Sequence, residues 1–437
     1  MTILKKTLKP FDGVSLLVGI TIGSGIFATP QIIAGYLNSF SSIIFLWIIV
    51  ALFVYIGALI YAELGCRFPN TGGEYIYIQK AFGPFWGFLF GWTQLFIIRT
   101  SAAAGLSMVT ANYLSYFFPM GQFEKNFIAI SIITLFVILN YIGIEKASLY
   151  NKFSSSIKIV GLFLFAVIGL IILKGDFSNL NQIKSPTGNL GPIGNSIAAL
   201  MLILFSFIGW DRVGYVAGEM KEPKKVIPQS MLIGMLIIAI LYISSNLLYH
   251  TVIGLEGMRQ STIIASETAV HLFGPIGAGL ISLMVIISAT GSINGTTMSA
   301  SRVYYAMAHD GLLFKWLDHI DERYQTPTHA IIAHGVWAAA LIIIRQNFET
   351  IVSGMVFAIL IFYAFTTIAF FKFRKENSGQ KDGYKLFGYP WIPSIYFIGI
   401  VSLLFLRAYY EFGNSVQDLA FILSGVPVYF IFFKNKK

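Results

Sequence analysis

The stretch GITIGSGIF, residues 19–27, places three glycines and two hydroxyl side chains inside a segment that is otherwise apolar. Glycine inside a helix costs about 1 kcal/mol relative to alanine. Gly19, Gly23 and Gly25 therefore indicate that a helix is interrupted here. At such a break, freed backbone N–H groups favour an anion and freed carbonyl groups favour a cation.

A second stretch, FSFIGWDRVG at residues 205–214, again combines glycine with polar residues in the middle of an apolar segment. Backbone at membrane depth must be paired inside the protein or line a cavity. Two such breaks facing each other would offer N–H groups and carbonyl groups together. A ligand that carries a carboxylate and an ammonium side by side is an α-amino acid, and the sequence predicts a site for one.

Two other readings of the first break compete with this one. Small residues in membrane helices often serve close helix packing alone, and for Gly19 and Gly23 this alternative stays open. Gly23, Gly25 and Ala28 also satisfy the G-x-G-x-x-G/A fingerprint of dinucleotide-binding proteins. That reading fails because no strand–turn–helix unit surrounds the motif and no acidic residue follows about 20 residues later.

The composition places these breaks in a membrane protein. The 437 residues are 56% hydrophobic and 11% charged, the mean hydropathy is +0.74, and soluble proteins carry about 25% charged residues. Windows of about 20 apolar residues predict an all-α polytopic protein with twelve spans. Their predicted ranges are 13–37, 41–64, 84–115, 126–144, 153–174, 193–217, 229–253, 274–307, 329–345, 349–373, 391–411 and 414–433.

The two breaks fall in the first and sixth spans, five spans apart. This spacing predicts a single transmembrane domain, residues 1–437, built from two inverted repeats of five helices. The repeats cover about 13–174 and 193–373, and two further helices cover about 391–433.

The net charge of +10 reflects orientation in the membrane. Twenty lysines and arginines fall in the loops on the side of the termini, and five fall on the opposite side. This bias predicts that both termini are cytoplasmic in a multi-pass protein of the cell (inner) membrane, and that no nucleic acid is bound. The five outer residues are Lys125, Lys174, Lys184, Arg259 and Arg345.

The chain offers little for metal, cofactor or redox chemistry. Cys66 is the only cysteine and the six histidines are scattered, so the sequence predicts no disulfide, no metal site and no cofactor. Neither HExxH nor GxSxG occurs, which argues against an enzyme.

Four spaced motifs resemble the amino acid–polyamine–organocation superfamily, and in particular its L-type amino acid transporter branch. They are GSGIF with the following Pro30, the loop at residues 68–92, the sixth span and its following loop at 208–228, and residues 308–332. The resemblance implies the LeuT-like fold and sodium-independent amino acid transport by alternating access.

The resemblance also assigns substrate-binding residues. Thr21, Ile22, Gly23, Ser24 and Gly25 would bind the carboxylate, mainly through backbone N–H groups and the Ser24 hydroxyl. Carbonyl groups near Ile20 or Thr21, and those of Phe205 and Ile208, would receive the ammonium. The intervening Ser206 is also assigned to the substrate site. Phe205 matches the aromatic gate that closes over the substrate from outside, although packing alone is the plainer reading of one phenylalanine. Ile208 stands where many members have glycine, which predicts small substrates.

Lys158 is an ionisable residue inside the predicted fifth span, where charges are expensive and often functional. The resemblance places it where sodium-using relatives hold that ion, so its ammonium would replace the cation beside the carbonyls of residues 19–22. The alternative is a side chain that extends to the cytoplasmic headgroups. Asp211, Arg212 and Arg99 are equally well read as structural ion pairs.

The sequence therefore predicts an exchanger of small or medium neutral L-amino acids in a lipid bilayer. A proton-coupled symporter and a non-transporting amino acid sensor on the same fold remain as alternatives. Eukaryotic L-type relatives attach to a heavy chain through a cysteine after the third span, and the corresponding loop FFPMGQFEKN has none. No disulfide-linked heavy chain is expected.

Overall fold

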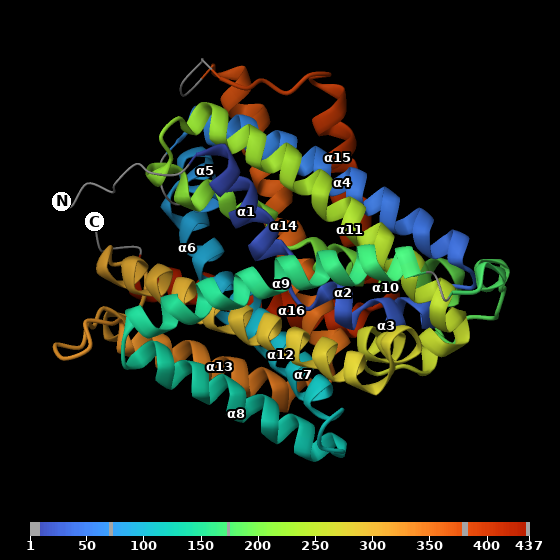
Figure 1. The fold of residues 1–437 in the computed structure, drawn as a ribbon. Coiled ribbons are helices and arrows are strands. Elements are labelled where there is room, and N and C mark those ends of the chain that lie inside the picture. Colours follow the sequence, from blue (N-terminus) through green and yellow to red (C-terminus); the bar gives the residue numbers. More distant parts are fainter. Residues whose placement is uncertain (1–8, 70–72, 173–174, 378–382, 434–437) are drawn as a thin grey trace.

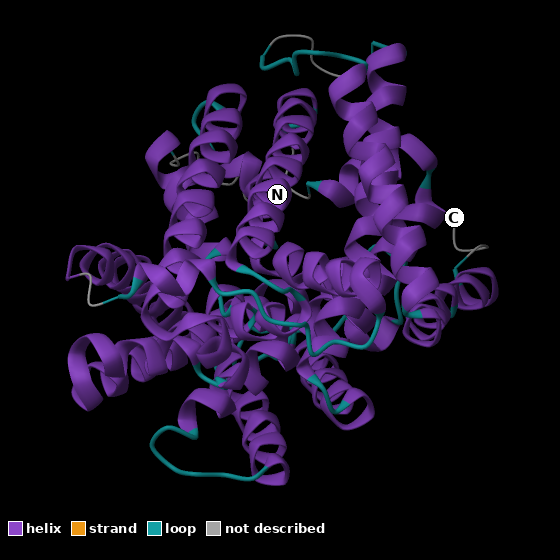
Figure 2. Cartoon of the chain, turned by 90° about the vertical axis from the view of Figure 1, so that its right-hand side faces the viewer, coloured by secondary structure: helices purple, strands orange, loops and turns teal. Residues whose placement is uncertain are grey.

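The computed structural model describes residues 9–69, 73–172, 175–377 and 383–433, and the chain in these ranges is almost entirely helical (Figures 1 and 2). An isolated bridge between Ser39 and Ile183 is the β-pairing that it contains. Residues 70–72 of the second motif lie outside the described residues. So do seven of the lysines counted for orientation, which are Lys5, Lys6, Lys174, Lys381, Lys434, Lys436 and Lys437.

The helices follow one another with short connections. In chain order they are α1 (Pro10–Thr21), α2 (Gly25–Ala28), α3 (Pro30–Tyr36), α4 (Phe40–Arg67), α5 (Glu74–Phe82), α6 (Pro84–Thr93), the π-helix η1 (Gln94–Ile98), α7 (Arg99–Leu114), α8 (Gln122–Tyr141), α9 (Ile144–Ile172), η2 (Phe177–Asn181), α10 (Gly191–Phe207), η3 (Trp210–Glu219), α11 (Pro223–Gln260), α12 (Ile264–His309), η4 (Lys315–Leu317), α13 (Thr328–Arg345), α14 (Phe348–Lys375), α15 (Trp391–Tyr410), α16 (Phe412–Leu423) and α17 (Gly425–Phe432).

Ten helices in the described part of the chain are long and apolar enough to cross a membrane, so the all-α polytopic class is confirmed. The count of twelve stays a prediction. The predicted third span is divided by η1 into α6 and α7, because a π turn shifts the helical hydrogen-bond register by one residue. The predicted eighth span, 274–307, begins at the Gly274 kink (φ 73°), whereas α12 already starts at Ile264.

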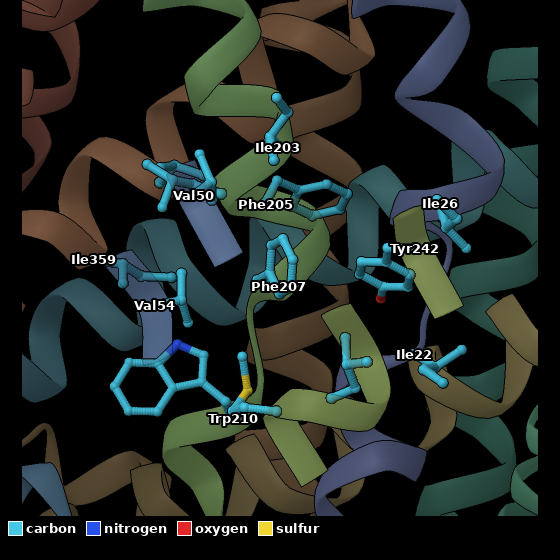
Figure 3. Close-up of a cluster of buried hydrophobic side chains, with 14 of the residues drawn as sticks. Ile22, Ile26, Val50, Val54, Ile203, Phe205, Phe207, Trp210, Tyr242 and Ile359 are labelled. Carbon is cyan, nitrogen blue, oxygen red and sulfur yellow. The ribbon is translucent and has the colours of Figure 1, made fainter. Parts of the chain in front are cut away.

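Both predicted breaks are present in the structure. The first helix ends at Thr21, passes through extended backbone at Ile22 (ψ 90°) and resumes at Gly25. The sixth helix ends at Phe207 and continues as the 3-10 helix η3 after Gly209, whose φ of 121° favours glycine. Figure 3 shows the ribbon thinning to a coil between Phe207 and Trp210.

The two broken helices lie against each other and run in opposite directions. The half-helix α1 packs beside η3, and α2 packs beside α10. The described part of the chain begins and ends on the same side of the molecule, at the left of Figure 1. We call that side the inner side and the opposite side the outer side, so α1 and η3 are the inner halves and α2–α3 and α10 are the outer halves.

The long helix α11 supports the breaks from behind. It lies along α4 (Figure 1) and also packs against α1 and η3. Tyr242 of α11 is fully buried between Trp47 and Phe207, with ring centroids 5.6 Å and 5.2 Å away. Edge-on aromatic contacts of this kind add about 0.5–1.5 kcal/mol beyond area burial, so this aromatic cluster fixes the position of the Tyr242 hydroxyl.

A buried ionic cluster connects the last helices to the rest of the bundle. The Asp418 carboxylate of α16 lies 2.6 Å from a guanidinium nitrogen of Arg345 and 2.8 Å from one of Arg407. Arg407 Nε also donates to Ser353 Oγ of α14 at 3.1 Å. Buried charges are tolerated when they are paired and hydrogen-bonded, and this cluster fastens α15 and α16 to α13 and α14.

Candidate substrate site at the paired helix breaks

The first break presents polar groups that lack protein partners. Gly23, Ser24 and Gly25 precede or begin the outer half-helix, whose first N–H groups have no carbonyl four residues earlier to bond. The hydroxyl oxygens of Thr21 and Ser24 are buried, and neither has a hydrogen-bond partner among the described residues. Buried polar groups are nearly always satisfied, so this arrangement indicates a place for a hydrogen-bonding ligand.

A single tyrosine joins the two breaks. The Tyr242 hydroxyl donates to the Ser206 carbonyl oxygen at 2.9 Å and to the Thr21 carbonyl oxygen at 3.1 Å. These carbonyls lie where each helix is about to lose its regular hydrogen bonds. Tyr242 therefore satisfies one side of the site while the hydroxyls of Thr21 and Ser24 remain available.

Glycine is required where the broken helices touch. A side-chain Cβ at Gly25 would lie 2.5 Å from Ser206 Cα, and one at Gly209 would lie 3.0 Å from Ile20 Cγ2. Gly23 differs, because the nearest atom to a Cβ there is 3.9 Å away. Gly25 and Gly209 thus serve close helix approach, whereas Gly23 leaves open space beside the break.

Ser206 is brought to the site, but its side chain is engaged in structural contacts. Its hydroxyl lies 3.0 Å from Thr29 Oγ1 and also donates to the Leu202 carbonyl at 3.2 Å. Its carbonyl accepts from Tyr242. The Phe205 carbonyl accepts the Ile208 N–H at 3.1 Å, so it keeps one lone pair for a further donor.

The outer side of the breaks is closed. The Phe205 ring is 8% exposed and meets the Phe348 ring of α14 edge-on, with centroids 5.8 Å apart. On the inner side of the breaks, Ile20, Gly23 and Asp211 are partly exposed. The site is therefore shut towards the outer side and more accessible from the inner side.

Lys158 reaches the first break through one intermediate residue. It is 3% exposed, and its Nζ donates to Ser292 Oγ of α12 at 3.3 Å. Ser292 Oγ in turn lies 4.0 Å from the Cβ position of Gly23. The described hydrogen bond of Lys158 thus goes to the Ser292 hydroxyl. The sequence analysis instead predicted a contact with the carbonyls of residues 19–22. Lys158 is buried, and its ammonium contacts α12.

Charged residues line a small cavity beside Ile208. The cavity measures about 10 Å³, which is room for about one water molecule. Its wall contains Glu74, Arg99, Asp211 and Arg212. The sequence pointed to the last three as structural charges, and the structure adds Glu74.

Glu74 lies in α5, between the second and third spans, and is fully buried. Its Oε1 accepts from the Tyr61 hydroxyl at 2.6 Å and from Thr366 Oγ1 at 3.0 Å. Burial, together with the charge of Asp211, raises the pKa of Glu74 to about 8, although these hydrogen bonds and Arg99 act in the opposite direction.

Sequence reasoning placed Ile20, Thr21, Ile22, Gly23, Ser24, Gly25, Phe205, Ser206 and Ile208 at one site, and the structure brings the two breaks that carry them together. It missed Tyr242, Ser292, Thr29 and Glu74. Glu74 belongs to the 68–92 motif, but the motif gave no role to this residue, and Tyr242, Ser292 and Thr29 stand outside the motifs.

Comparison with known proteins agrees with this architecture. The family model described as amino acid permease matches residues 8–433, which is nearly the whole chain. The chain belongs to the amino acid permease family. The permease fold thus accounts for the paired breaks, and amino acid transport is the family's activity.

Among its relatives, this permease is 29% identical over 436 residues to the serine/threonine exchanger SteT of Bacillus subtilis (strain 168), covering 99% of this chain and 98% of the relative. It is 28% identical to the mouse b(0,+)-type amino acid transporter 1, covering 99% and 88%. It is 27% identical to the human cystine/glutamate transporter, covering 98% and 85%. The permease is thus a multi-pass membrane protein similar along its whole length to amino acid transporters, one of which is named an exchanger.

Proposed function

We propose that this permease exchanges small or medium neutral L-amino acids across the membrane without sodium, by alternating access. The observation that carries the proposal is the pair of buried hydroxyls on Thr21 and Ser24, which have no partner in the described chain and lie beside freed N–H groups. A substrate carboxylate would accept hydrogen bonds from these groups, assisted by the dipole of the outer half-helix. Ile22, Gly23 and Gly25 would contribute backbone only.

The ammonium of the substrate would bind carbonyl oxygens of the two breaks. Those of Ile20 and Thr21 lie at the end of α1, and those of Phe205, Ser206 and Ile208 lie at the end of α10. Tyr242 already donates to the Thr21 and Ser206 carbonyls. Each carbonyl has a second lone pair for the ammonium, so the hydroxyl orients these acceptors without excluding the ligand.

A small side chain fits this permease best. Ile208 borders the cavity of about 10 Å³, and a cavity of this volume leaves no room for a large group. The similarity to the serine/threonine exchanger SteT supports the same substrate size. Another relative is named a cystine/glutamate transporter, so a panel of amino acids of different size and charge distinguishes the two substrate classes.

Alternation would proceed by closing the inner side and separating Phe205 from Phe348 on the outer side. Lys158 would act as a fixed cation that replaces sodium, because its ammonium lies beside Ser292 next to the first break. Proton-coupled symport through Lys158 is the second candidate. The same burial that keeps this ammonium from water would let it lose a proton during the cycle.

We also propose a domain organisation and a membrane location for the permease. Two inverted repeats, 13–174 and 193–373, followed by two helices at 391–433, would form one transport domain. The positive charges on the inner side support a location in the cell membrane with both termini cytoplasmic. The single cysteine, Cys66, is buried in α4, which supports the absence of a disulfide-linked heavy chain.

Counterflow in proteoliposomes tests the function directly. Vesicles loaded with unlabelled serine should take up labelled serine, and a panel of twenty external amino acids should compete in order of small size and neutrality. Uptake should be unchanged when sodium is replaced by choline. Labelled substrate that binds without entering would instead identify a sensor, and uptake that requires a pH gradient would identify a proton symporter.

Ser24→Ala provides the site-specific arm of this experiment. It removes one of the two unpartnered hydroxyls without adding volume and should weaken serine counterflow. Ser178→Ala, on the exposed segment η2, is the matched control. Equal counterflow in both variants would contradict the proposed carboxylate site.

A further inference from the structure

A polar cleft of about 560 Å³ opens on the outer side of the molecule. Ligand sites typically measure about 300–1,000 Å³, so the cleft is large enough for a small metabolite. Its wall is formed by α3, the loop before α10, the end of α11, the start of α14 and the turn between α15 and α16. The lining includes Gln31, Tyr36, Arg259, Glu349 and Glu411. Neither Phe205 nor Phe348 lines the cleft, so it is separate from the central site.

Gln31 contributes an unpartnered acceptor to this wall. The residue is 9% exposed, and its Oε1 is buried without a hydrogen-bond partner in the described ranges. A buried amide oxygen left unpaired costs about 1–3 kcal/mol. It therefore points to a ligand that donates a hydrogen bond.

Glu349 supplies a carboxylate to the same cleft. It lies in the first turn of α14, and its Oε1 accepts from the hydroxyl of Tyr36. Tyr36 and Gln31 both belong to α3, so a ligand between Gln31 and Glu349 would connect the outer half of the first helix to α14. Because the hydroxyl is uncharged, this contact leaves the charge of Glu349 unbalanced.

Arg259, the positively charged residue of the cleft wall, is bound to other protein groups. The guanidinium of Arg259 donates to the Ala34 carbonyl at 2.8 Å and to the Leu37 carbonyl at 2.9 Å. It also lies 3.9 Å from the carboxylate of Glu256. Arg259 therefore caps the C-terminal end of α3 and is balanced by its own acid.

The second acid of the cleft belongs to the buried ionic cluster. Glu411 lies 4.0 Å from Arg407, and Arg407 and Arg345 share Asp418. In this cluster the negative charges of Glu411 and Asp418 equal the positive charges of Arg407 and Arg345. The charges of Glu256 and Arg259 likewise cancel. Among the charged residues of the cleft wall, Glu349 is then left without an opposite charge, which gives the cleft a net charge of −1.

We propose that the outer cleft is a second binding site, which takes a primary ammonium group between Gln31 Oε1 and the Glu349 carboxylate. An ammonium carries one positive charge and three donors, which matches one excess carboxylate and one free acceptor. If the permease exchanges amino acids as proposed, this site would hold the ammonium of an amino acid on the outer side before the central site opens. The role rests on the proposed function, whereas ammonium binding does not.

Protection of an introduced cysteine tests the site. In a Cys66→Ala background, Asn189→Cys places a thiol in the exposed wall of the cleft. Its labelling by an uncharged maleimide should slow several-fold with n-butylammonium chloride. Tetramethylammonium chloride, which has no N–H donor, and sodium chloride at the same ionic strength should protect little. Gln122→Cys, exposed at the start of α8, reports effects unrelated to the cleft.

Glu349→Gln removes the charge and keeps an acceptor for Tyr36, and it should abolish most of the protection. Glu124→Gln, an exposed acid of α8, should retain it. Equal protection by sodium or tetramethylammonium, none by butylammonium, or full protection in Glu349→Gln would overturn the proposal. Counterflow on the same preparation separates the two ideas: protection without exchange removes only the transport function, and exchange without protection removes only this site.

Discussion

The hydroxyl of Tyr242 lies 2.9 Å from the carbonyl oxygen of Ser206, in a helix 36 residues away along the chain. The same hydroxyl lies 3.1 Å from the Thr21 carbonyl, 221 residues away. One side chain thus bridges two helix breaks that the chain brings together only in the folded state. The bridge explains how carbonyls freed from regular helix are kept satisfied and in position.

Tyr242→Phe should remove this bridge while preserving the aromatic packing. A net hydrogen bond contributes about 0.5–1.5 kcal/mol, so thermal unfolding in detergent should shift modestly, while counterflow falls more strongly because the substrate acceptors lose their orientation. Tyr116→Phe is the control, because its hydroxyl donates to the Pro275 carbonyl at 2.9 Å and touches neither break. Equal losses of counterflow in both variants would argue for a general packing effect.

Gly25→Ala and Gly23→Ala should differ in stability. A methyl group at Gly25 would lie 2.5 Å from the Ser206 backbone, whereas one at Gly23 would meet nothing within 3.9 Å. Overpacking of this kind costs about 1–3 kcal/mol, so Gly25→Ala should lower the unfolding temperature and Gly23→Ala should leave it nearly unchanged. The reverse order would contradict the described approach of the two breaks.

Lys158→Met should impair exchange while keeping the length of the side chain. A hydrogen bond to a charged group contributes about 1.5–3 kcal/mol, which corresponds to a loss in counterflow rate of roughly tenfold or more. Lys225→Met, an exposed lysine near the start of α11, should behave like the native protein. Unchanged counterflow in Lys158→Met would remove the fixed-cation role.

Phe205→Leu should make the central site easier to reach from outside. The edge-on contact with Phe348 contributes about 0.5–1.5 kcal/mol, so a membrane-impermeant thiol reagent should label Ser24→Cys roughly two- to twelvefold faster. Phe127→Leu, on the exposed face of α8, is the control in the same Ser24→Cys background. A labelling rate unaffected by Phe205→Leu would show that the closure lies elsewhere.

Glu74 should make stability depend on pH. Its folded pKa of about 8 exceeds the ordinary value of 4.5 for a glutamate, because burial disfavours the carboxylate. Between these values the folded protein binds the proton that the unfolded chain has lost, so the unfolding temperature should fall as pH rises from about 5 to about 8. Glu74→Gln should weaken this dependence, and Glu322→Gln, an exposed acid before α13, should not.

The sequence revealed the parts of the site that depend on local pattern. A cluster such as Gly23 and Gly25 in the middle of an apolar span conflicts with helix formation, and the conflict itself marks the break. The repetition of the pattern around Gly209 then indicated which two spans meet. Length and hydropathy were sufficient for the all-helical membrane class, because a bilayer permits few alternatives.

The rest depends on contacts between distant segments. Nothing near Tyr242 distinguishes it from the other 21 tyrosines, because its partners lie on other helices. The partner of Lys158 could not be identified as Ser292 for the same reason. The π segment at Gln94–Ile98 was also missed, since a register shift of one residue leaves the apolar pattern intact.

The contact between Gly25 and Ser206 has a mechanical consequence. Because not even a Cβ would fit between Gly25 and Ser206, we expect the outer half of the first helix and α10 to move together. Opening towards the outside would therefore move these two helical segments together as one rigid unit. This unit would separate from α14 at the contact between the Phe205 and Phe348 rings.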